Sequence, residues 1–174
     1  MFRFFFIILL FIYANASMTK EQISTYIKSP LKLGEKDINI PVWEILDENN
    51  KLNSYIFETF DYAPIAGFSG GKMNLLVSID LEGRFLEIHI LEQNEPVFVS
   101  GIGIEPFRKF LMQYKGKSLK DSIKIGSSKN QTSSIYIDGV SKATASVKIA
   151  NDMILGSTVQ KKKKKLMGVA PKQI

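Results

Sequence analysis

Residues 73–91 read Met-Asn-Leu-Leu-Val-Ser-Ile-Asp-Leu-Glu-Gly-Arg-Phe-Leu-Glu-Ile-His-Ile-Leu. The apolar run that ends at Asp80 has the composition of a β-strand. From Arg84 to Leu91 apolar and polar side chains alternate, which is typical of a strand with one apolar and one polar face. The residues between, Leu81-Glu82-Gly83, form a short link with a glycine. This stretch therefore predicts a β-hairpin.

A second hairpin is predicted upstream of the first. Residues 41–46 and 54–60 are rich in β-branched and aromatic side chains. The polar residues 47–53 between them favour a turn. Four strands are therefore expected in the first half of the chain.

Three segments have the pattern of amphipathic helices. The first, residues 19–27, begins with the spacing of a capping box. Apolar side chains recur at helical spacing over residues 106–114, and they form a broad face over residues 144–159. Residues 120–130 are polar, and a short strand is expected over residues 134–138. This mixed order predicts an α+β domain, with a mixed or antiparallel sheet and packed helices.

The composition excludes several classes of site. The 174 residues contain no cysteine and a single histidine, His89, so disulfides, thiolate metal sites, poly-His metal centres and thiol nucleophiles are excluded. Basic residues outnumber acidic ones by 23 to 17. Arg3, the run Lys161 to Lys165 and Lys172 supply the whole excess. Residues 17–160 are therefore nearly neutral, which argues against a nucleic-acid surface.

The first residues have the pattern of a secretory signal peptide. Arg3 precedes an apolar run from Phe4 to Tyr13, and Ala14-Asn15-Ala16 resembles a cleavage site. A membrane anchor is the alternative, but the run is about half of the roughly 20 residues that span a bilayer as a helix. We therefore expect residues 1–16 to be removed and the rest of the chain to be exported.

The last residues form a basic segment. Residues 161–174 begin with five lysines and show no apolar periodicity, so a flexible tail is expected. The lysines could contact anionic lipid or another polyanion at a membrane surface. The alternative is a solvated end without a partner.

The segment that bears most on function is Asp138-Gly-Val-Ser-Lys-Ala-Thr-Ala-Ser146, between a predicted strand and a predicted helix. A helix start offers unpaired backbone N–H groups and the positive end of the helix dipole, which suit a phosphate. The alternative is ordinary helix capping by the hydroxyl of Ser141 or Thr144. The local pattern leaves both interpretations open.

This segment resembles the flavinylation motif of the FMN-binding domains of NqrC, RnfG and the NosR/NirI family. The resemblance implies that the last threonine of the motif, Thr144, carries FMN through a phosphoester bond made by an ApbE-type flavin transferase. Asp138, Gly139, Ser141 and Ala143 occupy the other positions and are expected to help bind FMN. The departure is Lys142, where the family usually has glycine. Lysine would impair a position that needs a left-handed backbone and would be harmless at one that faces solvent.

The resemblance covers most of residues 58–156. The Gly67-Phe-Ser-Gly70 stretch and the Glu95-Pro96 pair, with the order of the segments around them, are similar to the NosR/NirI branch. Ser69 and Gly70 are expected to let a loop approach the planar flavin ring, with Ser69 donating a hydrogen bond to it. Glu95 and Pro96 are expected to order a loop beside it.

The resemblance implies a noncatalytic flavoprotein that relays electrons on the periplasmic side of the cytoplasmic membrane, linked to nitrous oxide or nitrite respiration. Its expected partners are the flavin transferase and a membrane redox protein. Alternatives are a noncovalent FMN-binding sensor or scaffold, and a truncated remnant of a longer membrane flavoprotein. The implied layout places an N-terminal extension of a helix and a hairpin at residues 17–57, and the FMN-binding domain at residues 58–160.

Overall fold

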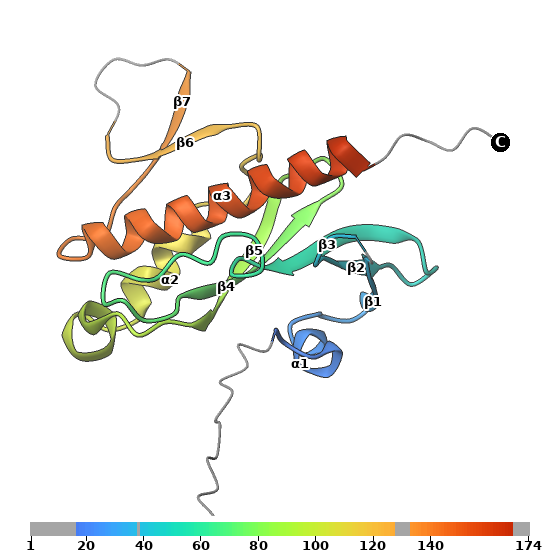
Figure 1. The fold of residues 1–174 in the computed structure, drawn as a ribbon, viewed down its shortest axis with the longest axis horizontal. Coiled ribbons are helices and arrows are strands. Elements are labelled where there is room, and N and C mark those ends of the chain that lie inside the picture. The colour runs from blue at the N-terminus through green and yellow to red at the C-terminus, as the bar shows by residue number, and fades with distance from the viewer. Residues whose placement is uncertain (1–16, 38, 128–132, 169–174) are drawn as a thin grey trace, which may run out of the picture.

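The computed structural model describes residues 17–37, 39–127 and 133–168, with side chains up to residue 157 (Figure 1). Within them, five strands form one antiparallel sheet in the order β1-β2-β3-β4-β5. The strands are β1 (Lys32–Lys36), β2 (Trp43–Leu46), β3 (Leu52–Glu58), β4 (Asn74–Asp80) and β5 (Phe85–Glu92). With the helices described below, this confirms the predicted α+β class.

The predicted central hairpin is β4 and β5. Their register places Leu76 opposite His89 and Ile79 opposite Phe85, with an irregularity between Ser78 and Ile79. All of β4 is buried except Asp80 at its end. Such a strand is apolar on both faces because the sheet is covered on both sides.

The upstream hairpin is also confirmed, as β2 and β3. The strand β1 was not predicted, because its sequence Lys-Leu-Gly-Glu-Lys has little apolar pattern. An edge strand needs backbone partners more than an apolar face, so sequence pattern is a weak guide to it. The predicted boundary between residues 57 and 58 falls inside β3, which pairs with β4. The N-terminal extension and the following domain therefore share one sheet.

Helices cover both faces of this sheet (Figure 1). Side chains of α2 (Glu105–Met112) and α3 (Thr144–Gly168) join the larger core cluster, which includes Phe57, Leu75 and Val77 of the sheet. The short α1 (Lys20–Ser24) buries Ile23 in a separate cluster with sheet residues on the other face. Its capping box is formed as predicted, although the helix ends earlier than expected, at Ser24.

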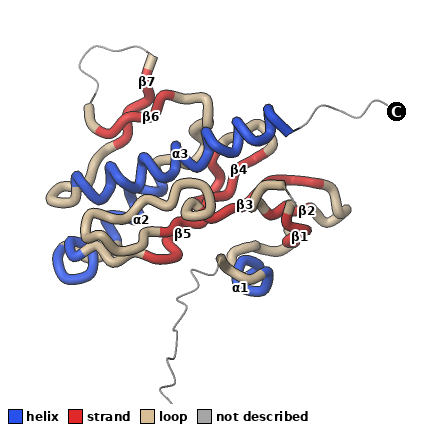
Figure 2. The backbone as a smooth tube through the Cα atoms, in the orientation of Figure 1, coloured by secondary structure: helices blue, strands red, loops and turns tan. Residues whose placement is uncertain are grey.

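Three features differ from the prediction. A π-helical turn, η1 (Val97–Gly101), follows Pro96. The strand β6 (Ser122–Ile125) lies in the polar segment and pairs in parallel with β7 (Ser134–Ile137), forming a small sheet set apart from the main one (Figure 2). The last helix continues past Val159 to Gly168, so the expectation of a flexible tail from residue 161 is wrong for residues 161–168, because glutamine and lysine are good helix formers and no proline interrupts them.

The predicted signal peptide lies outside the described residues. Among the residues that the structure describes, no helix is both long and apolar enough to cross a membrane.

Candidate functional site

The segment from Asp138 to Ser146 connects β7 to α3 and forms the first turn of that helix, as predicted. β7 ends at Ile137, and α3 begins at Thr144. The Ala143 N–H donates to the Val140 carbonyl at 3.1 Å, and the Ala143 carbonyl accepts from the Val147 N–H at 3.0 Å. Ala143 is therefore the residue at which the helical hydrogen bonds begin, and it has no side-chain group that could cap them.

The start of α3 has free hydrogen-bond donors. No group in the described part of the chain accepts from the backbone N–H of Thr144, Ala145 or Ser146. The hydroxyls of Ser141 and Thr144 likewise make no hydrogen bond with a described residue, and both side chains are exposed. Capping by either hydroxyl, the alternative interpretation, is therefore not observed. The free donors and the helix dipole suit an anionic group at this point.

A glutamine clamp fixes the turn before α3. The side-chain carbonyl of Gln113 accepts from the Asp138 N–H at 2.7 Å, and its amide donates to the Asp138 carbonyl at 3.0 Å. Gly139 lies close to β6, because a Cβ there would be 3.2 Å from Ile125 Cγ2. The two motif residues thus help to set the turn geometry. The role of Gln113 was not predicted from the sequence, because this residue follows α2 and belongs to no local motif.

A buried carboxylate joins the separately predicted parts of the site. Glu95 is 1% exposed. Its Oε1 accepts from the N–H and the hydroxyl of Ser69, both at 3.2 Å, and its Oε2 accepts from the hydroxyl of Ser146. The loop that contains Ser69 and the first turn of α3 are therefore fastened to the same side chain. Ser69, predicted to donate to the flavin ring, directs its donors to Glu95 and to the Asn94 carbonyl.

The Glu95-Pro96 pair forms an ordered turn. The Glu95 carbonyl accepts from the N–H groups of Phe98 and Val99 at 2.9 and 3.0 Å. Pro96 precedes the first residue of η1 with a φ of −55°. This backbone geometry directs the Glu95 side chain inward, where it is buried.

The glycines of the loop have two different roles. Gly70 has a φ of +79° and open space where a Cβ would point, so it supplies only the left-handed backbone. A Cβ on Gly67 would lie 2.2 Å from Glu95 Oε1. Gly67 thus makes room for the carboxylate rather than for a planar ring.

We expect Gly67→Ala to destabilise the protein by about 2–3 kcal/mol, because the methyl group must displace the Glu95 carboxylate and its hydrogen bonds. Gly70→Ala is the matched control and should cost about 1 kcal/mol, the strain of a left-handed alanine. Urea unfolding of both variants measures the difference. A cost for Gly70→Ala equal to or above that for Gly67→Ala would contradict this role.

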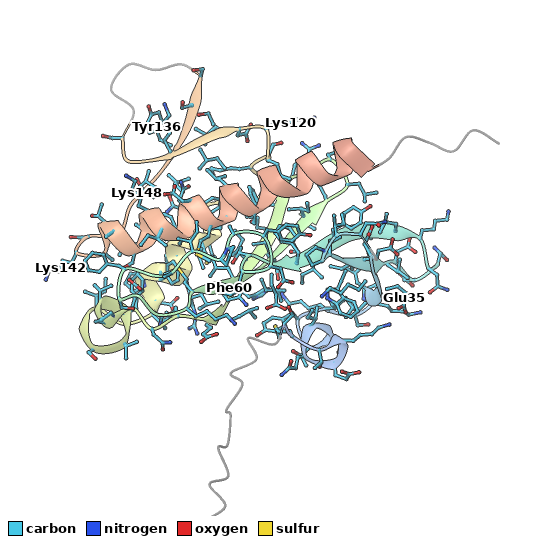
Figure 3. All side chains as sticks on the ribbon, viewed as in Figure 1. Glu35, Phe60, Lys120, Tyr136, Lys142 and Lys148 are labelled. Atoms are coloured by element: carbon cyan, nitrogen blue, oxygen red, sulfur yellow. The ribbon has the colours of Figure 1, made fainter. Side chains whose placement is uncertain are left out.

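The departure from the family motif lies in a left-handed conformation. Lys142 has a φ of +67°, and its exposed side chain lies at the start of α3 (Figure 3). The position therefore favours glycine for its backbone, which explains the usual residue of the motif. Lysine adopts the same conformation here, and the turn that presents Thr144 is formed.

We expect Lys142→Gly to stabilise the protein by about 0.5–1 kcal/mol. Relief of left-handed strain contributes about 1–2 kcal/mol, and the added flexibility of the unfolded glycine offsets part of it. Lys148→Gly is the control, because this exposed residue lies inside α3 (Figure 3) and the change should cost about 1 kcal/mol. Chemical denaturation measures the free energy of unfolding of both variants. If Lys142→Gly were as destabilising as Lys148→Gly, the backbone of Lys142 would not be strained.

A cleft of about 480 Å³ lies elsewhere, between β5 and α2, and none of the predicted cofactor-binding residues lines it. His89 lies in this cleft, and its Nε2 is 3.1 Å from Oε2 of Glu87. Partial burial raises the pKa of Glu87, but hydrogen bonds and charge interactions with Lys28 and His89 outweigh it. The pKa of Glu87 is therefore lowered from its ordinary value. Ser141, Lys142 and Thr144, at the start of α3, are exposed on the surface.

The fold and this site define a class of protein. It is an α+β domain in which a buried glutamate holds the loop of Ser69 against the first turn of α3, where the Thr144 hydroxyl is exposed. The family model described as "FMN-binding domain" matches residues 67–155. The chain belongs to this family, and FMN is its cofactor.

Two relatives support the NosR/NirI branch. Regulatory protein NosR of Stutzerimonas stutzeri is 22% identical over 159 residues, which cover 87% of this chain and 21% of that protein. Protein NirI of Paracoccus denitrificans (strain Pd 1222) is 24% identical over 128 residues, which cover 74% of this chain and 18% of that protein. The matches confirm the resemblance, and the chain spans about a fifth of the length of these relatives.

Proposed function

We propose that the chain carries FMN esterified to the Thr144 hydroxyl and relays electrons through it outside the cytoplasm. One observation carries the proposal: an exposed threonine hydroxyl without a described partner lies at the first position of α3, beside three free backbone N–H groups. Ala143, and not Thr144, is at the capping position, so helix capping does not use the Thr144 hydroxyl. Both the hydroxyl and the N–H groups are therefore available.

The residues around Thr144 fit a phosphate. The N–H groups of the exposed Thr144 and Ala145 are free to donate to phosphate oxygens, and the helix dipole favours negative charge there. The ammonium group of Lys142, two residues earlier in the chain, adds a positive charge near the same helix start. The departure from glycine thus supplies a counter-ion while it keeps the turn.

The attachment chemistry identifies the kind of partner required. Esterification joins Thr144 Oγ to the phosphorus of FMN and releases the hydroxyl proton, so the phosphorus must lose a leaving group. A flavin dinucleotide offers a nucleoside monophosphate for this purpose when its pyrophosphate bond breaks. An ApbE-type flavin transferase is the partner that we propose for this step, acting on the exposed start of α3.

Bound flavin supplies one-electron and two-electron transfer, and the protein positions and tunes it. The surface location leaves the site open to the redox centre of a membrane partner protein. The matches to Regulatory protein NosR and Protein NirI support the link to nitrous oxide or nitrite respiration, or its regulation, that the family resemblance implies. The signal-peptide pattern of residues 1–16 supports export to the periplasmic side of the cytoplasmic membrane.

The proposal is tested by exporting the full chain from cells that coexpress a flavin transferase. We expect an intact mass raised by one esterified FMN, cleavage after Ala16, and a yellow colour that stays with the protein after acid precipitation and bleaches reversibly on reduction. An unmodified, colourless protein would overturn the proposal. Flavin that is present but released by acid would identify a noncovalent binding module instead.

A further inference from the structure

Exposed apolar side chains gather on the segments that border the site. Six large hydrophobic side chains are exposed among the described residues, and Ile65, Phe68 and Val99 are three of them. Ile65 and Phe68 lie in the loop before β4, and Val99 lies in η1. Figure 1 shows both segments at the same end of the molecule as the start of α3. Phe68 is 71% exposed.

The backbone around Phe68 is fixed. The Gly67 N–H donates to the Gly71 carbonyl at 2.8 Å, and the Ser69 N–H donates to Glu95 at 3.2 Å. Phe68 therefore has a hydrogen-bonded neighbour on each side, and its exposure does not come from a loose loop. An aromatic ring that is mostly exposed contributes little to the core, and with Ile65 and Val99 it adds apolar surface that a ligand could cover.

The same hydrogen bonds link the loop that contains Phe68 to the helix that begins at the proposed attachment point. Ser69 contacts one carboxylate oxygen of Glu95, and Ser146, in the first turn of α3, contacts the other. The ribityl chain sets the isoalloxazine ring of FMN away from its phosphate. The ring of a flavin attached at Thr144 would therefore extend away from the helix start, and the loop that Glu95 holds next to that start is a neighbouring surface.

We propose that Phe68 is a flavin-contacting residue whose ring packs against the isoalloxazine of FMN attached at Thr144. This inference rests on the proposed function. Planar aromatic rings stack with an offset and gain more than their buried area alone provides. Ile65 is 39% exposed and, like Val99, has no planar group for such stacking. Contact with Phe68 shields one part of the ring from water.

The test compares flavin emission in flavinylated Phe68→Trp and Leu81→Trp. An indole stacked on an isoalloxazine quenches its fluorescence by electron transfer, so Phe68→Trp should lose most of the emission of the parent protein. Leu81 is the matched control, because it is 52% exposed and follows β4 at the end away from the loop. The seven residues of β4 separate the two ends by roughly 20 Å. Leu81→Trp should keep the parent emission.

Intact mass is recorded for every sample, so that the two hypotheses fail in different ways. With FMN present, equal emission from the two tryptophan variants would overturn the contact with Phe68 and leave the proposed function in place. A parent chain without FMN mass would overturn both. A second variant, Phe68→Ala, should make the bound flavin more accessible to iodide quenching, and unchanged accessibility would also contradict the contact.

Discussion

Thr144→Ala will abolish the covalent attachment of FMN and leave the fold intact. The hydroxyl makes no hydrogen bond with a described residue, and the side chain is exposed, so nothing in the core depends on it. Alanine is also the best helix former, which suits the first position of α3. After coexpression with a flavin transferase, intact mass and acid-stable absorbance should show a complete loss of FMN, with an unchanged unfolding midpoint.

Two variants serve as controls for this loss. Ser141→Ala removes the other exposed hydroxyl of the turn and should keep full FMN mass. Thr144→Ser keeps a hydroxyl at the same position and should retain attachment. Acid-stable FMN on Thr144→Ala, or its loss from Ser141→Ala, would move the attachment point away from Thr144.

Much of the fold was predictable because its strongest elements have strong local patterns. The run that became β4 and the periodic segment that became α2 are decided by their own apolar side chains. The strands β1 and β6 were missed for the opposite reason. Each is short: β1 has little apolar pattern, and the two isoleucines of β6 lie within a segment that is otherwise polar, so backbone pairing with a neighbour decides both.

The site divides in the same way. The helix start at Thr144 follows from a local motif, and the left-handed backbone at Lys142 was one of the two alternatives that the motif raised. The contact between Glu95 and Ser146 joins residues 51 positions apart, and the clamp of Gln113 on Asp138 joins residues 25 apart. Contacts of this kind depend on tertiary packing, so no local spacing could reveal them.

Glu95 explains how three separate segments make one site. Burial of a carboxylate is costly unless its oxygens accept hydrogen bonds. Here Ser69 and Ser146 provide them, and the positive end of α3 lies next to the charge. The free-energy cost of burying the Glu95 carboxylate is therefore offset only when the loop of Ser69 and the start of α3 are both in place. This dependence couples the position of Phe68 to that of Thr144.

Glu95→Ala should therefore lower the free energy of unfolding by about 2–3 kcal/mol, because it leaves a cavity and removes the acceptor of the buried Ser146 hydroxyl. Glu95→Gln keeps the volume and one acceptor oxygen, and it should cost about half as much. Urea unfolding of the chain without flavin measures both. Flavin attachment should fall in the same order, because the loop and the helix start lose their common anchor.

Glu92→Ala is the control for Glu95→Ala, because it removes a nearby carboxylate that does not join the loop to the start of α3. Glu92 is 45% exposed and lies 3.4 Å from Lys72 in a surface ion pair, which contributes about 1 kcal/mol or less. Its removal should leave both stability and attachment nearly unchanged. If Glu95→Ala were no more destabilising than Glu92→Ala, the buried carboxylate would not be the anchor of the site. A large effect of Glu95→Ala alone would show that the loop and the start of α3 are held as one unit.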